Sequence, residues 1–420
     1  MSLFSFRLGQ TRERLVQVGA AVAIAVLVQG CGAGYRPVVT PVSPSGPAQQ
    51  PSGQAVVISS PSTTSNGIAT IVDYSGDTIM ATAAVGLNPV AFTLDASGTT
   101  GYTLNSDGTL TNFPATSQLQ EKNIIYSTLP AAALPVNMFS PTAGIWAADL
   151  NNNVTDVLTG SPETFKLAIP VTQTPVTVVG PGGGGQRNYT ISQGAVTDAM
   201  ECNLSPTSGP IGSAGALEVA TYTVSATLPM GRCPVFAVQS PDNRRMFVLN
   251  RGDDTITVIN SQNNTLDACT PFVSQSGRTV TCHPSLPLST TAGLTGTNVP
   301  AIAGPVYAEY NVAASQLVIA DYDGGAISVI DVSLDEYGND SDTFGTTFTI
   351  PVGNNPASVT ALYDGSQAYT ANQTGGTVTI VNLSSHTAEK TLAVVGHPRT
   401  GVSISNSLYG KGYAACPDSR

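Results

Sequence analysis

Asparagine and aspartate recur at one position of this chain, at the end of a short alternating segment. Five such segments end in Asn105, Asp149, Asn250, Asp321 and Asn372. Gathered at one place, carboxylate and amide oxygens could bind a cation or a polar ligand, and carboxylates beside an arginine or histidine could perform acid–base catalysis. The same residue types stabilise tight turns through their own side chains, and we weigh that structural role higher. The candidate ligand-binding set is Asn250, Arg251, Asp253, Asp321, Asp323, Asn372, Arg232 and His397.

The other residues that could perform chemistry do not indicate a catalytic site or a metal site. The histidines His283, His386 and His397 fall in different parts of the chain without paired spacing, which argues against a zinc, copper or haem site. There is no Gly-x-Ser-x-Gly nucleophile motif. We therefore expect no metal and no cofactor, and we assign no catalytic residue.

Cysteines indicate where loops are stapled. Cys269 and Cys282 lie 13 residues apart, and we expect them to form a disulfide. Cys202 and Cys233 are a second candidate pair, and Cys416 is left over. Sequence alone does not fix the connectivity.

These residues belong to a repeat whose units begin with proline. The units start at Pro89, Pro135, Pro175, Pro234, Pro305, Pro356 and Pro398, at spacings of 40 to 71 residues. In a Thr- and Val-rich chain, such a period predicts propeller blades of four antiparallel strands. Only half a unit follows the last proline, and Gly67–Asp73 reads like the missing half. We therefore predict an all-β, seven-bladed β-propeller, closed by a split blade in which residues 67–73 pair with residues 410–416.

The alternating segments carry a family resemblance. Tyr102-Thr-Leu-Asn105 and Tyr369-Thr-Ala-Asn372 resemble the tetrapeptide of the YVTN-repeat β-propeller family, and the resemblance covers residues 66–420. It implies a propeller but no single activity, because the family includes surface-layer and binding proteins as well as lactonase-like relatives. Two insertions, at about 194–214 and 266–303, interrupt the repeat and are expected in loops, where function often resides.

The N-terminus is typical of a targeting segment. Arginines precede the apolar run Leu15–Val28, which ends shortly before Cys31. This resembles a bacterial lipoprotein signal, so we expect export, a lipid on Cys31 and a place in the cell envelope, at the outer membrane in a Gram-negative host. The expected parts are a signal peptide at 1–30, a Pro- and Ser-rich tether at 31–64 and the propeller at 65–420.

The composition limits the classes of partner that the protein can bind. Charged residues make up 10% of the chain and the net charge is −11, which argues against nucleic acid. We predict a monomeric, lipid-anchored binding or scaffold protein without enzymatic activity, with a membrane contact through the lipid and a protein or glycan partner. The alternative is a lactonase-like hydrolase of the same fold.

Overall fold

The structure is a computed structural model of the chain. It describes residues 54–59, 62–73, 78–95, 97–140, 144–180, 186–195, 210–275, 277–362, 364–393 and 414–415. Cys31, Cys202, His397, Pro398 and Cys416 lie outside these residues, as do the predicted signal peptide and most of the predicted tether. Among the residues described, none belongs to a helix long and apolar enough to cross a bilayer.

The described chain is built almost entirely from antiparallel β-sheets, as predicted. Six sheets each contain four consecutive strands, and each begins at a proline that starts a repeat unit. The sheets are β4 (Pro89–Leu94), β5 (Thr100–Asn105), β6 (Thr109–Pro114) and β7 (Ile125–Thr128); β8 (Pro135–Phe139), β9 (Ile145–Asp149), β10 (Val154–Gly160) and β11 (Glu163–Pro170); β12 (Pro175–Val179), β13 (Arg187–Ser192), β14 (Ile211–Glu218) and β15 (Thr223–Arg232); β16 (Pro234–Gln239), β17 (Arg245–Asn250), β18 (Thr255–Asn260) and β19 (Thr265–Leu266); β23 (Pro305–Asn311), β24 (Gln316–Asp321), β25 (Ala326–Asp331) and β26 (Thr347–Pro351); and β27 (Pro356–Ala361), β28 (Gln367–Asn372), β29 (Thr377–Asn382) and β30 (Thr387–Ala393).

A further sheet joins segments from the two ends of the sequence. It contains β1 (Gln54–Ser59), β2 (Asn66–Asp73) and β3 (Thr78–Leu87), and β31 (Ala414–Ala415) pairs in parallel with β1. The predictions that residues 54–59 belong to the tether and that residues 67–73 pair with residues 410–416 are both wrong, because β2 pairs with β1 and β3. The segment Gln54–Ser59 buries Val56 and Ile58 and takes the place beside β2 that was assigned to the C-terminal strand.

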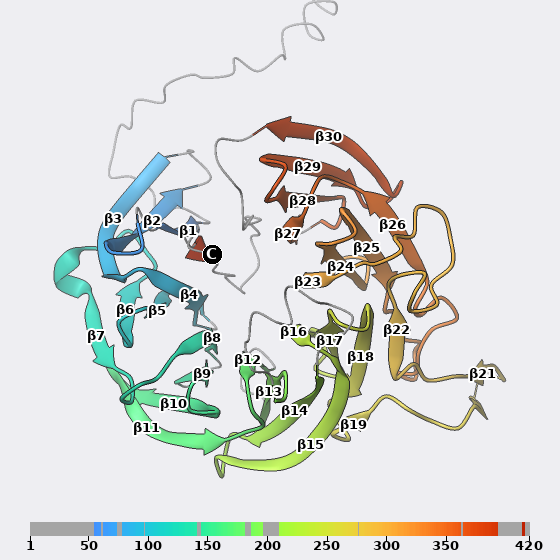
Figure 1. The fold of residues 1–420 in the computed structure, drawn as a ribbon, viewed down its shortest axis with the longest axis horizontal. Helices are drawn as coiled ribbons and strands as arrows, with labels where there is room; N and C mark the ends of the chain where they lie inside the picture. The colour runs from blue at the N-terminus through green and yellow to red at the C-terminus, as the bar shows by residue number, and fades with distance from the viewer. Residues whose placement is uncertain are drawn as a thin grey trace, which may run out of the picture. The chain divides into compact units, whose positions relative to one another are not determined.

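The sheets surround a common centre in Figure 1, with the first strand of each of the six sheets innermost. These inner strands β4, β8, β12, β16, β23 and β27 contact one another in succession. The second strand of a sheet packs between neighbours on both faces, so β17 is buried along its whole length. The outermost strands face solvent, and β30 is exposed throughout.

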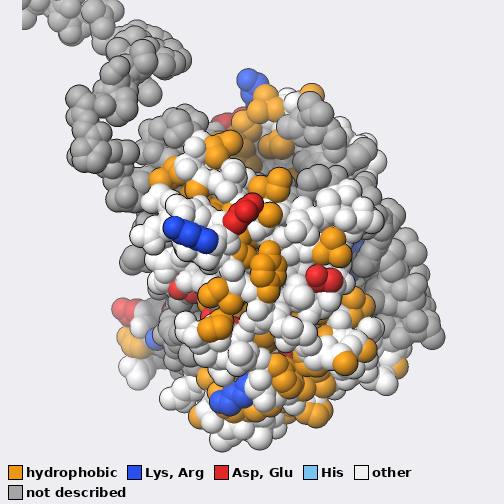
Figure 2. Space-filling model, turned by 90° about the vertical axis from the view of Figure 1, so that its left-hand side faces the viewer, with side chains coloured by type: hydrophobic (Ala, Val, Ile, Leu, Met, Phe, Trp, Pro, Cys, Tyr) orange, Lys and Arg blue, Asp and Glu red, His pale blue; other side chains and the backbone are white. Residues whose placement is uncertain are grey.

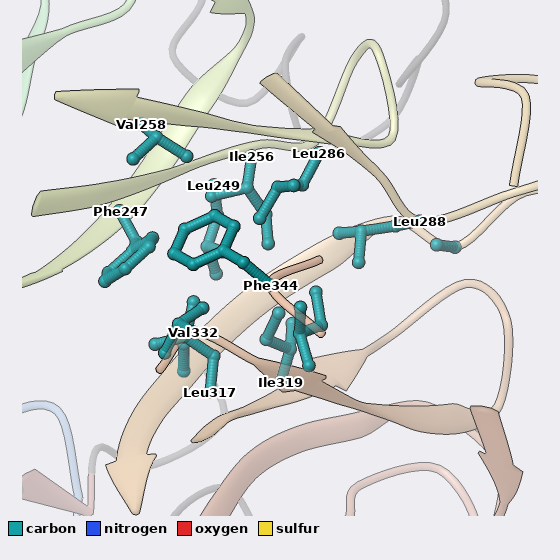
Figure 3. Packing of buried hydrophobic residues seen from close by; sticks show 13 residues of the cluster. Phe247, Leu249, Ile256, Val258, Leu286, Leu288, Leu317, Ile319, Val332 and Phe344 are labelled. Atoms are coloured by element: carbon teal, nitrogen blue, oxygen red, sulfur yellow. The ribbon is translucent and has the colours of Figure 1, made fainter. Parts of the chain in front are cut away.

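Apolar side chains fill the spaces between sheets. Figure 3 shows the largest such cluster, where Phe247 and Leu249 of β17 face Leu317 and Ile319 of β24. Phe344, from the loop between β25 and β26, closes the cluster. The outer surface in Figure 2 instead shows apolar side chains scattered among polar atoms, with few charges.

The insertion at residues 266–303 divides the outer strand of its sheet. β19 pairs with one end of β18, and β22 (Ser285–Pro287) pairs with the other end. Between them, β20 (Phe272–Val273) and β21 (Thr279–Val280) form a small hairpin. A 3₁₀ turn, η1 (Glu121–Asn123), precedes β7.

Candidate ligand-binding site

The recurring asparagines end the second strand of their sheets and hold the sheets together. Asn372 Nδ2 donates to the hydroxyl oxygens of Thr377 and Thr379 on β29, at 3.0 and 2.8 Å. Asn105 and Asn250 repeat this arrangement with the corresponding threonines of β6 and β18. All three side chains are buried, so their polar groups are used inside the fold and not in a ligand site at the rim.

Each of these asparagines also requires a glycine in the junction before its sheet. A Cβ atom on Gly353 would lie 2.6 Å from Asn372 Nδ2, and one on Gly86 would lie 2.1 Å from Asn105 Nδ2. The Gly231 N–H donates to Asn250 Oδ1 at 3.1 Å. The glycine three residues before each of these prolines is therefore explained by its close packing against the asparagine that ends the second strand.

In two sheets the second strand ends in an aspartate, Asp149 or Asp321, in place of the asparagine. Ser328 donates to Asp321 Oδ2 at 2.6 Å, whereas Asp321 Oδ1 has no hydrogen-bond partner. Burial, helped by the charge of Asp254, raises the pKa of Asp321 to about 8. Burial and the neighbouring Asp149 raise the pKa of Asp156 to about 7. These aspartates are buried in the sheets and do not converge on one ligand position.

Other members of the predicted set pair across the same rim. Arg251 is buried and binds Asp323 of the next sheet, with Nη2 3.0 Å from Oδ1, and it lies over the ring of Tyr322 at 5.3 Å. Burial raises the pKa of Asp323, although Arg251 opposes this. Asp253 accepts from the backbone N–H of Arg232. The structure thus brings Arg251 together with Asp323 and Arg232 with Asp253, while His397 lies outside the described residues.

A pocket lies at the opposite ends of the strands. It has a volume of about 330 Å³ and is formed by the turn between β16 and β17, the turn between β23 and β24, and the loop that follows β25. Its lining includes Ser240, Asp242, Arg244, Phe247, Tyr310 and Asp335. Such a volume suits a small molecule.

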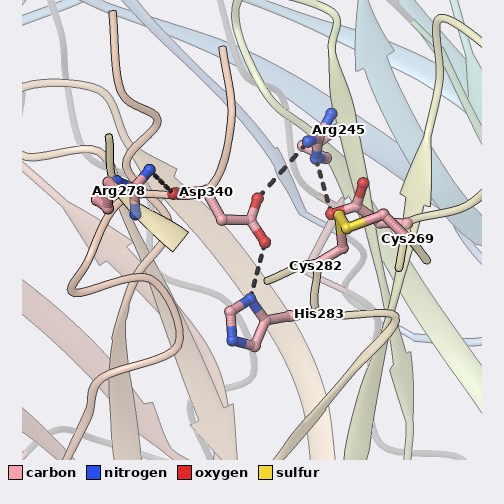
Figure 4. The surroundings of a disulfide bond; sticks show 7 residues. Arg245, Cys269, Arg278, Cys282, His283 and Asp340 are labelled. Carbon is pink, nitrogen blue, oxygen red and sulfur yellow. Dashed lines mark hydrogen bonds and ion pairs between the residues drawn. A yellow bond between two sulfur atoms is a disulfide. The ribbon is translucent and has the colours of Figure 1, made fainter. Parts of the chain in front are cut away.

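A buried group of charges supports the inner wall of this pocket. Arg245 lines the pocket, and its Nε donates to Asp267 Oδ2 at 3.1 Å. Its Nη2 lies 3.5 Å from Asp340 Oδ1, and His283 Nδ1 lies 2.8 Å from Asp340 Oδ2 (Figure 4). Burial raises the pKa of Asp267 to about 6, because it outweighs the opposing charge of Arg245.

The disulfide holds two members of this charge group in place. Cys269 and Cys282 are bonded, with Asp267 two residues before the first and His283 directly after the second. The Arg278 side chain, inside the bridged loop, donates to Asp335 Oδ2 at 2.8 Å. Cys233 is also disulfide-bonded, and its expected partner Cys202 lies outside the described residues.

Sequence reasoning missed both the pocket and its supporting charges. His283 and Asp340 are 57 residues apart and belong to different repeat units, so no local spacing links them. Arg245 gives no motif either, because it is one residue of an apolar strand. Among the described residues, no three His, Cys, Asp or Glu side chains form a group that could hold a metal ion.

Comparison with known proteins supports the fold. No family model and no curated protein matches the chain. A functionally unknown protein from Desulfotomaculum acetoxidans DSM 771 is 11% identical, with 84% of this chain and 99% of that chain covered and a TM-score of 0.55. Dihydro-heme d1 dehydrogenase NirN in complex with DHE is 15% identical, with 85% and 68% covered and a TM-score of 0.54. Apo AztD from Citrobacter koseri is 11% identical, with 82% and 83% covered and a TM-score of 0.50. The chain is thus a β-propeller, and likeness at these identities concerns the fold alone.

Proposed function

We propose that this chain is an exported, lipid-anchored β-propeller of the cell envelope that binds a ligand without converting it. Disulfide bonds support export, because they persist in oxidising compartments. The Arg-rich start, the apolar run and Cys31 support a lipid anchor. The protein is a monomer of the YVTN-repeat type, and in a Gram-negative host it sits at the outer membrane.

The ring has seven blades in this proposal, the seventh built from both chain ends. The pairing of β31 with β1 supports this arrangement, since it links residues 58 and 59 to residues 414 and 415. A closed ring leaves no long sheet edge free to aggregate.

One observation supports the binding role. The recurring polar residues form hydrogen bonds and ion pairs within the fold, while a pocket lies at the opposite ends of the strands. Asn250 and Asn372 are buried in their sheets, and Arg251 is paired with Asp323. The pocket has donors and acceptors on its walls. The arrangement therefore suits capture of a small molecule or of the end of a glycan.

Two measurements test this function. Cys31→Ser should move the protein from the membrane fraction to the soluble fraction of the cell that exports it, and retention of the variant in the membrane would contradict the anchor.

The mature protein should leave a panel of lactones unhydrolysed, and saturable turnover would contradict the non-enzymatic role.

A lactonase-like hydrolase is the second candidate, favoured by one observation. Arg245, which lines the pocket, and His283 both contact Asp340, and a hydrolase needs a base near its substrate. The side chain of His283 is 32% exposed, while the Asp340 side chain beneath it is buried. If the enzyme reading is correct, His283→Ala abolishes lactone turnover and leaves the thermal unfolding midpoint nearly unchanged.

A further inference from the structure

The pocket walls are preformed by turns that satisfy their own hydrogen bonds. In the turn before β17, Ser240 donates to Asp242 Oδ1 at 2.6 Å, and the Arg244 N–H donates to the same oxygen at 3.1 Å. In the facing loop, the Tyr337 and Asn339 N–H groups donate to Asp335 Oδ1, each at 2.9 Å. A preformed site loses little entropy when it binds a ligand.

The charged side chains of the inner pocket wall are already paired with opposite charges before any ligand arrives. Arg245 contacts the two buried carboxylates of Asp267 and Asp340. Asp335 is neutralised by Arg278 at 2.8 Å. An ionic ligand would find no uncompensated counter-charge there and would lose its hydration, which disfavours both anions and cations.

The side chains of Asp242 and Arg244 form a donor–acceptor pair that remains reachable from solvent. Their side chains are 46% and 41% exposed, and Arg244 Nε lies 3.8 Å from Asp242 Oδ2. A carboxylate only accepts hydrogen bonds and a guanidinium only donates, whereas a hydroxyl does both. Two neighbouring hydroxyl groups on one ligand can therefore satisfy both side chains at once.

One part of the pocket lining is apolar and aromatic. Tyr310 and Leu334 are partly exposed there, while Phe247 and Val332 lie behind them in the core, with the Phe247 and Tyr310 ring centroids 6.5 Å apart. Aromatic rings offer a face to C–H groups, while a polar rim fixes orientation. A ring with one apolar face and hydroxyl groups at its edge fits this combination.

We propose that the pocket between the β16–β17 turn and the loop after β25 binds an uncharged sugar residue. The ring lies against Tyr310, and two adjacent hydroxyl groups bind Asp242 and Arg244. This inference rests on the proposed binding function, since it names the ligand class of that same site.

Calorimetric titration of the mature protein tests the proposal with defined probes. Glucose, N-acetylglucosamine and rhamnose are the neutral probes, and glucosamine and glucuronate are the charged counterparts of glucose. At least one neutral sugar should bind saturably, and glucosamine and glucuronate should bind more weakly than that sugar. If no neutral sugar binds, or if a charged counterpart binds more tightly, the proposal is wrong.

Matched arginine variants locate the binding. Arg244→Ala should weaken the neutral sugar by about tenfold or more, because it removes the donor of the pair. Arg187→Ala is the control, since Arg187 lies at the equivalent end of the neighbouring sheet, paired with Glu218 and away from the pocket. Equal losses in both variants, or no loss in Arg244→Ala, would overturn the assignment.

Failure of this proposal is separable from failure of the proposed function. Absence of sugar binding, together with release of Cys31→Ser from the membrane and no lactone turnover, would remove only the ligand class. Lactone turnover would instead remove the non-enzymatic function.

Discussion

Replacing Asp321 by asparagine should stabilise the protein at neutral pH. Asp321 is fully buried at the position where other sheets carry asparagine, and its Oδ1 has no hydrogen-bond partner. An amide there can donate to the Ser328 hydroxyl, as Asn372 donates to Thr379 at 2.8 Å. The variant therefore restores the arrangement found in the other sheets, without a change of side-chain size.

The magnitude follows from the raised pKa of Asp321, which is about 8 in the folded protein against an ordinary value of 3.8. Above pH 3.8 the unfolded chain releases this proton while the folded protein keeps it, so the free energy of unfolding falls as pH rises towards 8. About three pH units separate 3.8 from 7, each worth about 1.4 kcal/mol, which gives a cost of about 4 kcal/mol at pH 7. Asparagine does not titrate, so Asp321→Asn should gain up to this amount at pH 7 and almost nothing at pH 4.

Denaturant unfolding of both proteins between pH 4 and pH 9 measures the effect. The difference between the two curves should grow with pH up to about 8 and then level off. Other buried acids, such as Asp156, titrate in both proteins and cancel in the difference. Asn372→Asp is the reciprocal control, which should introduce a similar pH dependence into a neighbouring sheet. Parallel curves for Asp321→Asn and the wild type would show that Asp321 does not have a raised pKa in the folded protein.

Three further substitutions address the packing and the pocket wall. Gly353→Ala should lower the free energy of unfolding by about 1–3 kcal/mol, because its Cβ would meet Asn372 Nδ2 at 2.6 Å, and Asn372→Ala in the same chain should reduce that loss. Cys269→Ser with Cys282→Ser should destabilise by about 2–4 kcal/mol, and protease should then cut the insertion faster; an unchanged cleavage rate would contradict this. Arg245→Met should cost about 3–5 kcal/mol at pH 7 and less at pH 5, because it leaves two buried carboxylates without a cation; denaturant unfolding at the two pH values measures both losses, and equal losses would argue against the charge group.

Much of the fold was predictable from the sequence, because a proline marks the start of each repeat unit. Proline begins the inner strands, where its missing N–H is tolerated at the first residue. The alternating segments ending in Asn105 and Asn372 form strands, and each is the second strand of its sheet. The end segments were harder to predict, because the short apolar run at residues 55–58 follows a stretch rich in proline and serine that is typical of a linker.

The candidate site was less predictable, because its contacts join residues distant in sequence. The recurrence of the asparagines suggested a binding role, but their partners are threonines of the next strand, which for Asn250 and Asn372 lie five and seven residues later. The pattern Asn-x₄-Thr-x-Thr is visible in the sequence and could have indicated this structural use. Nothing comparable links Arg245 to Asp340, which only the packing of neighbouring sheets brings together.

We propose that binding occurs in the pocket beside Arg244 and Tyr310, while the polar residues at the opposite ends of the strands stabilise the sheets. The decisive measurement is a crystal structure of the mature protein soaked with the neutral sugar that binds most tightly in the calorimetric titration. The sugar should lie in the pocket, with its ring against Tyr310 and hydroxyl groups within hydrogen-bond distance of Asp242 and Arg244. A sugar bound beside Arg251 and Asp323, or an empty pocket at saturating sugar, would contradict it.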